Sequence, residues 1–409
     1  MRALLAAVGT RGDVQPALAL ALELKKLGHA VRMCISPNFV DWAKRLGLEA
    51  LPMGVEMRMP TQGAAPKPLT PEELRRLRES MPDLIADQFE TIGAAAEGCD
   101  VIVGANAHQY AAPSIAKLKG IGYVTAVYAP VALPSPDLAP PPSPLQAPAA
   151  ASASIAEQWR NTAKAWNERA LERVNRNRVR LGMDPIDDVL EYVLTDHTWL
   201  AADAALAPVP ATPGRKIFQT GAWVLADRTP LPADLERFLE SGKPPILVGL
   251  GSMPAGADAG RPLIGAVRAL GRRVLVSRGW AGLDRIDNAA DCMSVGDVSY
   301  DSLFPRVEAV VHHGGAGTTA TAARAGIPQV ITPMFGDQFY WASRIVHLGL
   351  GATTPHSTVT EESLGRALRE ALDPAVTARA RAFALRVRSD GAAVAARQLD
   401  IVYSPESKC

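Results

Sequence analysis

The same local pattern occurs twice in the 409-residue chain: a short apolar run, a glycine loop, a longer segment closed by glycine, and another apolar run. Near the N-terminus it reads RALLAAV, GTRGD, VQPALALALELKKLG and HAVRMCI, and further on it reads PPILVGLGSMP, RPLIGAVRALG and RRVLVSRG. Continuous apolar runs beside glycine turns are typical of buried parallel strands. The repeat therefore predicts two α/β units, each built around a parallel sheet. Ligands of such sheets bind at the carboxyl ends of the strands, so we expect the site in the cleft between the units.

Shifts in composition suggest how the chain divides into domains. Residues 207–232 are rich in turn-forming residues and lie between the two repeats. They predict a linker between an N-terminal domain at 1–206 and a C-terminal domain at 233–380. The proline-rich residues 130–148 predict a loop, which is either a rigid connector or a ligand contact. Residues 154–182 predict a helix whose mixed Arg and Glu side chains form a solvated face.

Charge and cysteine content exclude several classes of function. The 43 Lys and Arg residues almost balance the 42 Asp and Glu residues, so no global field favours nucleic acid or an anionic membrane. No stretch of about 18 apolar residues could span a bilayer. The scattered cysteines have no metal-ligand spacing and are interpreted as reduced thiols. They are Cys34, Cys99, Cys292 and Cys409. We expect a cytoplasmic protein with no nucleic-acid partner and no membrane insertion.

The segment HHGGAGTTATAARAG, at 312–326, is the strongest candidate for a ligand site. Its glycines fall between an apolar run that predicts a strand and an alanine-rich run that predicts a helix. Backbone can approach a ligand closely there, and the free N–H groups at the helix start favour an anion such as phosphate. Further donors would be His312, His313, Thr318 and Thr319. A tight corner capped by the histidines is the structural alternative.

These residues alone do not decide which phosphate-containing ligand would bind. A Walker loop is absent, but residues 315–320 satisfy GxGxxA, and Asp337 follows at about the spacing of a ribose-binding acid. The match therefore predicts, as one alternative, an NAD(P)-dependent oxidoreductase. Asp337 and Gln338 also offer a carboxylate beside a carboxamide, which suits sugar hydroxyls. A simple helix cap by Asp337 is the other interpretation.

Several stretches, taken in order, resemble the family 1 glycosyltransferases. They are GTRGDVQP, TDHTWLAAD, QTGAWVL, GLGSMPAG, RRVLVSRGW and VVHHGGAGTTATAARAGIPQVITPMFGDQFYWASRIVHLGLG. The resemblance covers most of the chain and is closest to bacterial enzymes that glycosylate antibiotics and other natural products, including the vancomycin-group glycopeptide glycosyltransferases. It implies an α/β GT-B fold, in which two Rossmann-like domains face a central cleft. It also implies that the final helices, at 381–409, pack back on the N-terminal domain.

The resemblance implies a division of labour, with the acceptor on the N-terminal domain and the nucleotide-sugar on the C-terminal domain. The residues it places around the donor diphosphate are His313, Gly315, Gly317, Thr318 and Ser252. Those it places on the transferred sugar are Asp337 and Gln338, and those near the nucleoside are Trp280 and Val295. Gly314 would shape the turn, and Thr10, Arg11 and His312 would be neighbours of the active site.

Asp13 is the candidate catalytic base. It stands at the carboxyl end of the first predicted strand, where it would face the cleft, and the resemblance implies that it deprotonates the acceptor hydroxyl where many relatives have histidine. The helix dipole would lower its pKa and burial would raise it. The alternative role is the N-cap of the first helix. His108 is the other titratable residue whose position could face the acceptor.

The expected function is an inverting, metal-independent transfer of glucose or a related hexose from a UDP- or dTDP-sugar to a hydroxyl of a natural-product aglycone. No DxD pair occurs in the chain, so no metal is expected, and no cofactor beyond the nucleotide-sugar cosubstrate. A nucleotide-sugar epimerase and a two-lobed binding protein without catalysis are further alternatives. The acceptor and the base of the donor cannot be read from the sequence.

Overall fold

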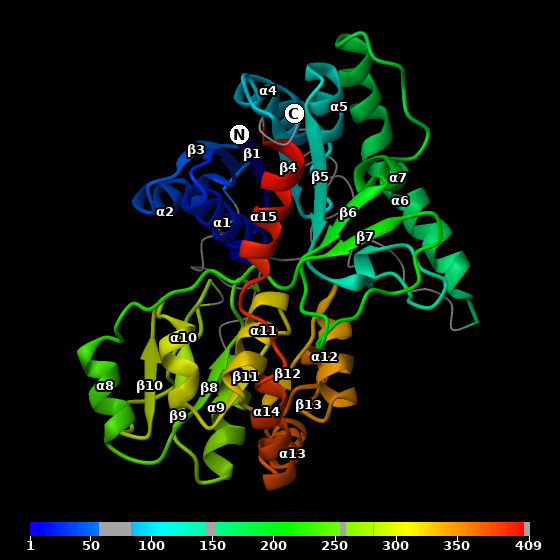
Figure 1. Ribbon diagram of the computed structural model, residues 1–409. Coiled ribbons are helices and arrows are strands. Elements are labelled where there is room, and N and C mark those ends of the chain that lie inside the picture. The colour runs from blue at the N-terminus through cyan, green and yellow to red at the C-terminus, as the bar shows by residue number, and fades with distance from the viewer. Residues whose placement is uncertain (57–82, 144–151, 254–258, 281, 405–409) are drawn as a thin grey trace.

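The computed structural model describes residues 1–56, 83–143, 152–253, 259–280 and 282–404 and shows two α/β domains, one above the other in Figure 1. Each domain is built on one sheet whose strands all pair in parallel. The N-terminal sheet has the order β3-β2-β1-β4-β5-β6-β7, and the C-terminal sheet has the order β10-β9-β8-β11-β12-β13. The prediction of two units, each wound around a parallel sheet, is confirmed. Cys409 and residues 144–148 of the proline-rich loop lie outside the described residues.

The elements of the N-terminal domain follow the sequence pattern closely. Its strands are β1 (Arg2–Ala7), β2 (Ala30–Ile35), β3 (Glu49–Pro52), β4 (Val101–Ala105), β5 (Gly122–Val127), β6 (His197–Leu200) and β7 (Lys216–Gln219). Its helices are α1 (Arg11–Lys26), α2 (Val40–Arg45), α4 (Leu84–Ala95), α5 (Ala112–Lys119), α6 (Ile155–Arg180) and α7 (Val189–Leu194), with short 3₁₀ turns η1 (Pro37–Phe39) and η2 (Pro130–Ala132).

The C-terminal domain repeats the arrangement. Its strands are β8 (Ile246–Gly249), β9 (Val274–Ser277), β10 (Cys292–Val295), β11 (Ala309–His312), β12 (Gln329–Ile331) and β13 (Gly351–Thr353). The helices after β7 are α8 (Ala233–Glu240), α9 (Gly260–Ala269), α10 (Tyr300–Leu303), α11 (Ala316–Ala325), α12 (Gln338–His347), α13 (Glu361–Ala371), α14 (Pro374–Ala384) and α15 (Gly391–Tyr403), with η3 (Phe304–Arg306) and η4 (His356–Thr358).

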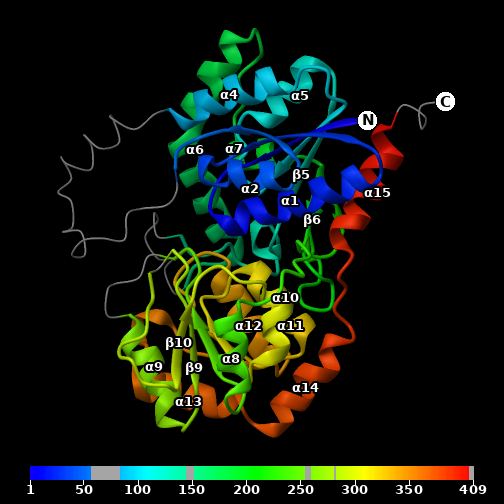
Figure 2. The ribbon, with the colours of Figure 1, turned by 90° about the vertical axis from the view of Figure 1, so that its left-hand side faces the viewer.

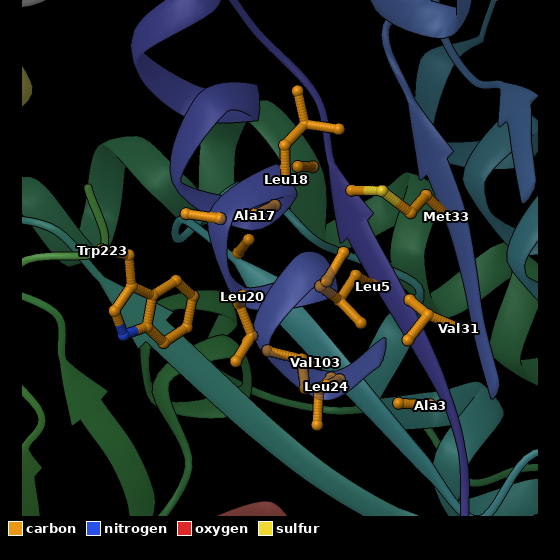
Figure 3. Packing of buried hydrophobic residues seen from close by; sticks show 14 of the residues in the cluster. Ala3, Leu5, Ala17, Leu18, Leu20, Leu24, Val31, Met33, Val103 and Trp223 are labelled. Carbon is orange, nitrogen blue, oxygen red and sulfur yellow. The ribbon is translucent and has the colours of Figure 1, made fainter. Parts of the chain in front are cut away.

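The core of the N-terminal domain explains why the opening run becomes an interior strand of the sheet. Every residue from Ala3 to Ala7 is fully buried, because helices cover both faces of the sheet. Figure 3 shows Leu5 of β1 packing among Leu20 of α1, Val31 of β2 and Val103 of β4. This packing fixes the end of β1, and therefore the start of α1, at one edge of the sheet.

Two of the expected boundaries are corrected by the structure. The segment 207–232 is not all linker, because β7 lies within it and completes the N-terminal sheet beside β6. A four-residue strand among turn-forming residues leaves little periodic signal. The boundary at 381 falls inside α14, which packs against α11 of the C-terminal domain. Only α15 returns to the N-terminal domain, where it packs against α1 (Figures 1 and 2).

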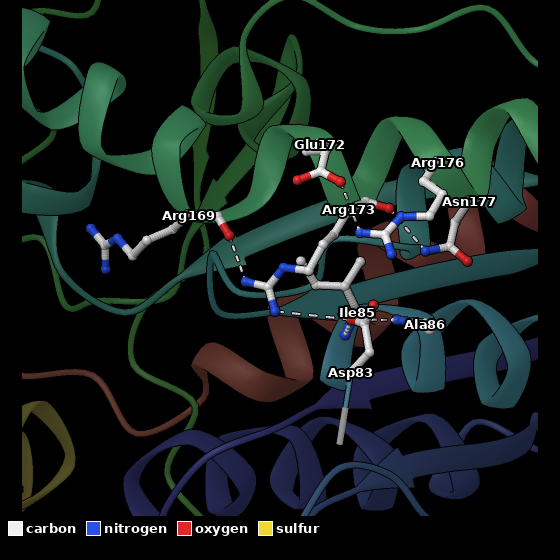
Figure 4. Close-up of polar contacts among 8 residues, drawn as sticks. All are labelled: Asp83, Ile85, Ala86, Arg169, Glu172, Arg173, Arg176 and Asn177. Atoms are coloured by element: carbon white, nitrogen blue, oxygen red, sulfur yellow. Dashed lines mark hydrogen bonds and ion pairs between the residues drawn. The ribbon is translucent and has the colours of Figure 1, made fainter. Parts of the chain in front are cut away.

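Most of the charged side chains of α6 are solvated, as the sequence predicts, but Arg178 is buried. Arg176 pairs with Glu172 at 3.3 Å, and the Arg173 guanidinium lies 4.0 Å from Asp83, which caps α4 (Figure 4). Exposed pairs of this kind contribute little to stability. Among the described residues, no helix combines the length and apolar character needed to cross a membrane.

Candidate active site

Asp13 lies at the junction between β1 and α1. Thr10 is the N-cap residue of α1, and Asp13 is the third residue of the helix. The Asp13 Oδ2 atom accepts hydrogen bonds from the Thr10 backbone N–H (2.7 Å) and from the Thr10 hydroxyl (3.3 Å). The alternative in which Asp13 is itself the N-cap is therefore wrong. Asp13 is instead the acidic member of a capping box, and this role fixes one of its two carboxylate oxygens.

Gly9 allows the Asp13 carboxylate to sit so close to the loop. Its φ is +142°, and a Cβ at this position would lie 2.1 Å from the Asp13 Oδ2 atom. The Gly9 backbone is held in turn by Ser36, whose hydroxyl bonds both the Gly9 N–H (2.8 Å) and its carbonyl (2.9 Å). A side chain at residue 9 would both strain the backbone and displace the carboxylate.

The surroundings of Asp13 decide the balance of effects on its pKa that the sequence left open. The other carboxylate oxygen, Oδ1, accepts a hydrogen bond from Asn106 Nδ2 at 2.9 Å, and the Tyr128 hydroxyl donates to the Asp13 carbonyl at 3.0 Å. Burial raises the pKa of the Asp13 carboxyl, and the hydrogen bonds from Thr10 and Asn106 oppose this by a smaller amount. A raised pKa suits a carboxylate that has to accept a proton.

His313 lies at a strand-to-helix junction of the C-terminal domain, between β11 and α11. Its ring fits between two glycines: a Cβ on Gly251 would lie 2.8 Å from the ring Cε1, and one on Gly315 would lie 2.8 Å from Nε2. Burial lowers the pKa of His313 to about 4, so the imidazole is neutral near pH 7. Its Nδ1 atom is buried and has no hydrogen-bond partner among the described residues. An unpaired buried imidazole nitrogen calls for a ligand, because leaving it unpaired is costly.

Two cavities adjoin this junction. The first, of about 240 Å³, is lined by Gly249, Gly251, His313 and Thr318 together with other residues of the C-terminal domain. The second, of about 400 Å³, is lined by Gly12 and Tyr128 from the N-terminal domain and by Ala316 and Gly317 from the C-terminal domain. The starts of α1 and α11 therefore border one cavity between the domains.

His312 has a different role from its neighbour. It is buried, its Nε2 atom is 2.9 Å from the Gln329 Oε1 atom, and its Nδ1 atom accepts the Gly314 backbone N–H at 3.1 Å. Burial lowers the pKa of His312 to about 3, which keeps the ring neutral. Because both ring nitrogens are engaged, His312 holds the turn that Gly314 makes at a φ of +97°.

Asp337 and Gln338 stand at the start of α12. The Asp337 Oδ2 atom accepts a hydrogen bond from Trp341 Nε1 at 3.0 Å, and burial raises the pKa of Asp337 to about 6. Gln338 is 4% exposed, and its Oε1 atom accepts the backbone N–H groups of Met334 (2.8 Å) and Phe335 (3.3 Å). The Gln338 side-chain oxygen is thus held by the loop, and its amide nitrogen donates to the Met253 sulfur at 3.2 Å, which leaves one N–H of the amide that could donate to a sugar.

Trp280 and Arg11 make contacts between the two domains. The Trp280 ring stacks on Phe39 of the N-terminal domain, with centroids 5.6 Å apart and planes 14° from parallel. The Arg11 guanidinium forms a 3.1 Å ion pair with Asp297 of the C-terminal domain. These residues therefore help to set the distance between the domains, a role that sequence reasoning did not give them.

Two other residues predicted for the donor site, Val295 and Ser252, line neither of the two cavities. The Val295 side chain is 5% exposed and belongs to the core cluster that includes Leu275 and Phe304. This placement corrects the expectation that its side chain faces a nucleoside. Alternation along a strand puts neighbouring side chains on opposite faces, and in this doubly covered sheet the face that carries Val295 packs into the core. Ser252 is half-buried in the turn that follows β8, directly after Gly251.

Comparison with known proteins identifies the family to which this two-domain chain belongs. Residues 3–132 match the glycosyltransferase family 28 N-terminal domain, and residues 264–398 match the erythromycin biosynthesis protein CIII-like, C-terminal domain. The vancomycin aglycone glucosyltransferase of Amycolatopsis orientalis is 44% identical over 98% of this chain and 97% of its own length. The chain belongs to the antibiotic-type glycosyltransferases.

Two further proteins support the assignment of this chain to the glycosyltransferases. The dTDP-epi-vancosaminyltransferase of Amycolatopsis orientalis is 39% identical over 93% of this chain and 92% of its own length. The solved structure of the glycotransferase of kitacinnamycin superposes with a TM-score of 0.70 over 98% of both chains, at 18% identity, and shows the GT-B fold. These findings do not favour the oxidoreductase, the epimerase or the binding protein.

Sequence reasoning missed two residues that shape the site of the glycosyltransferase, Gly9 and Asn106. Glycine directly after a buried strand is a signal for Gly9, but it does not show which side chain approaches it. Asn106 follows β4 and reaches Asp13 because β4 pairs with β1. No local signal reports a contact between residues so far apart in the chain. No group of three or more His, Cys, Asp or Glu side chains in the described ranges could hold a metal ion.

Gly317 allows a test of the proposed diphosphate site that is separate from folding. A Cβ at this position would meet no atom within 4 Å, and Gly317 is exposed in the first turn of α11. Gly317→Ala is expected to raise the free energy of unfolding by about 0.4–1 kcal/mol, because alanine restricts the unfolded chain. It is also expected to raise the KM for the donor, because the methyl group would stand where a phosphate approaches the backbone.

Gly365→Ala, within α13, is the matched control for this variant. A Cβ there would meet only the Arg369 guanidinium at 3.8 Å, which is an ordinary contact. Thermal unfolding and donor kinetics should show stabilisation in both variants and a raised KM in Gly317→Ala alone. An unchanged KM in Gly317→Ala would place the diphosphate away from the start of α11.

Proposed function

We propose that the enzyme transfers glucose or a related hexose from a UDP- or dTDP-sugar to a hydroxyl of a natural-product aglycone, with inversion at the anomeric carbon. The observation that carries the proposal is the cavity between the domains, which is lined by Gly12 at the start of α1 and by Gly317 at the start of α11. Asp13 is the residue after Gly12, so in this proposal its carboxylate acts from the α1 side of the cavity and the anion-binding start of α11 lies on the other side. We further propose that neither a metal ion nor another cofactor takes part.

In this proposal the donor diphosphate lies against the start of α11. The free backbone N–H groups of the first turn, the Thr318 hydroxyl and the unpaired Nδ1 atom of His313 supply donors there. As the bond between the anomeric carbon and the diphosphate oxygen breaks, negative charge grows on that oxygen. Donors fixed before the reaction stabilise this charge without reorganisation. Asp337 and the amide nitrogen of Gln338 would hold hydroxyls of the sugar.

Asp13 would act on the acceptor. Its carboxylate takes the proton from the acceptor hydroxyl, and the oxygen attacks the anomeric carbon on the face opposite to the leaving diphosphate. One carbon–oxygen bond forms as the other breaks, so the configuration at the anomeric carbon inverts. The proton then leaves Asp13 for solvent, and a nucleoside diphosphate is released.

Aromatic residues near Asp13 support an acceptor of extended, planar character. The exposed His108 ring stacks on Trp166, with centroids 5.3 Å apart, and meets Tyr110 edge-on at 6.2 Å. Such faces bind aromatic groups with little loss of conformational freedom. The similarity to the vancomycin aglycone glucosyltransferase is in keeping with a natural-product aglycone as the acceptor of this enzyme.

Binding and product analysis together test the proposal. Calorimetric titration with UDP, dTDP and NAD, with a chelator present throughout, is expected to show binding of UDP or dTDP and none of NAD. The enzyme should then form a glycoside from the matching UDP- or dTDP-glucose in chelator, and NMR should show the β-configured product from the α-configured donor. Binding of NAD alone, an epimerised donor as the only product, or activity lost in chelator and restored by a divalent metal would each overturn the corresponding part of the proposal.

A further inference from the structure

Asn106 is the side chain that reaches Asp13 from the neighbouring strand. β4 pairs with β1 in register, Gly104 beside Ala6, so that the ends of the two strands lie together at one sheet edge. Asn106 is 8% exposed and has a φ of +73°. Among residues other than glycine, Asn and Asp adopt this left-handed region most readily. The position therefore combines an unusual backbone with a buried polar side chain.

The hydrogen bonds of Asn106 fix which way its amide faces. The Nδ2 group donates to the Val8 carbonyl (3.0 Å) and to Asp13 Oδ1 (2.9 Å). The Oδ1 atom accepts from the His108 backbone N–H (3.0 Å) and from Gln109 Nε2 (3.2 Å). A carbonyl can only accept and a backbone N–H can only donate. The amide nitrogen must therefore point at Asp13, and the amide cannot flip without breaking these bonds.

The two oxygens of the Asp13 carboxylate are consequently held unequally. Oδ2 accepts two hydrogen bonds from Thr10, whereas Oδ1 accepts only the one from Asn106 within the part of the chain that the structure describes. A carboxylate oxygen has about two acceptor sites. Oδ2 is thus filled by the capping box, and Oδ1 keeps one site that can take a proton.

We propose that Asn106 is a positioning residue for the reaction, which directs the free acceptor site of Asp13 Oδ1 toward the acceptor hydroxyl. This inference rests on the proposed role of Asp13 as the base. Asn106 touches no reacting atom in this arrangement. It acts by holding the carboxylate in one rotamer and by donating to its charged form, which a side chain without a hydrogen-bond donor could not do.

Other ionisable groups also face Asp13. His108 follows β4, Tyr128 follows β5 and Asp337 begins α12, and each interacts electrostatically with the Asp13 charge. A pH profile therefore reports on the whole group. The variants below leave these three residues unchanged, so a difference between variants reports on residue 106.

Asn106→Asp separates positioning from a purely structural role. Asp has the same size and the same tolerance for the left-handed region, but it puts an oxygen where Nδ2 faced Asp13. Two adjacent carboxylates share a proton, which raises the apparent pKa of the pair. The acid limb of kcat/KM against pH is expected to move upward by about one pH unit or more. Asn288→Asp, an exposed amide-to-acid change in the C-terminal domain, should leave the limb in place.

Asn106→Gly provides the second variant. Glycine keeps the left-handed turn but removes the donor, so kcat is expected to fall roughly 10–100-fold, the size expected for losing one hydrogen bond to a charged group. Binding of UDP or dTDP by the C-terminal domain should stay at the wild-type level in both variants, which shows that the fold is intact. If Asn106→Asp kept the wild-type acid limb, or Asn106→Gly kept the wild-type kcat, Asn106 would only hold the turn.

The same experiment distinguishes this inference from the function on which it rests. If the wild-type enzyme formed no glycoside, or if Asp13→Asn retained turnover, the proposed function of the site would fail. If the wild type were active and Asp13→Asn inactive, yet Asn106→Asp kept the wild-type acid limb or Asn106→Gly kept the wild-type kcat, the positioning role alone would be refuted.

Discussion

Asp13→Asn is expected to lower kcat by roughly 10²–10⁴-fold, the usual contribution of a general base. Asparagine fits the same space, and its carbonyl can still accept the Thr10 N–H that closes the first turn of α1. The fold should therefore survive, whereas an amide cannot accept the proton of the acceptor hydroxyl. Initial rates of glycoside formation measure the loss, and calorimetry with UDP or dTDP should show unchanged donor binding.

The pH dependence of the wild-type activity also tests Asp13 as the base. Because burial raises the pKa of Asp13 above its ordinary value of 3.8, the base is protonated at a higher pH than an exposed aspartate. Activity should be present above this raised pKa and lost as the pH falls through it. Asp41→Asn, an exposed carboxylate on α2, is the matched control and should change neither kcat nor the acid limb. Near-normal turnover in a folded Asp13→Asn enzyme would mean that another group is the base.

Local patterns were sufficient to predict most of the fold. The apolar runs that become β1 and β8 and the glycines beside them are consecutive in the chain, so both units could be found without knowing any contact. β7 was missed because an edge strand of four residues is paired on one side only and needs little apolar sequence. The division between α14 and α15 depends on which domain each helix packs against, and composition does not report this.

The site was predictable only where its chemistry is carried by neighbours in the sequence. His313 and Gly317 belong to one turn, and the structure places both beside cavities. The contact of Asn106 with Asp13 and the stacking of Trp280 on Phe39 arise from strand order and domain packing. Such contacts join distant parts of the chain, and the local patterns of a single sequence do not predict them.

His313→Ala is expected to weaken binding of UDP or dTDP and to lower kcat by roughly 10²–10³-fold, the effect of removing one donor from a developing negative charge. The ring occupies space that Gly251 and Gly315 leave open, and its Nδ1 atom has no partner among the described residues. Because the pKa of His313 is lowered to about 4, the imidazole acts as a neutral donor at both pH 6 and pH 8. The loss of affinity, measured by calorimetry, should therefore be the same at these two values.

The matched control is His347→Ala, which removes an exposed imidazole from the end of α12 and should leave donor binding unchanged. How the effect divides between affinity and rate then shows when His313 acts. A loss in affinity equal to the loss in kcat/KM would mean that the imidazole binds ground state and transition state alike. A fall in kcat with unchanged affinity would mean that His313 interacts only with the charge that appears on the leaving diphosphate. Unchanged affinity and unchanged kcat together would remove His313 from the donor site, and the free N–H groups of α11 would have to bind the diphosphate without it.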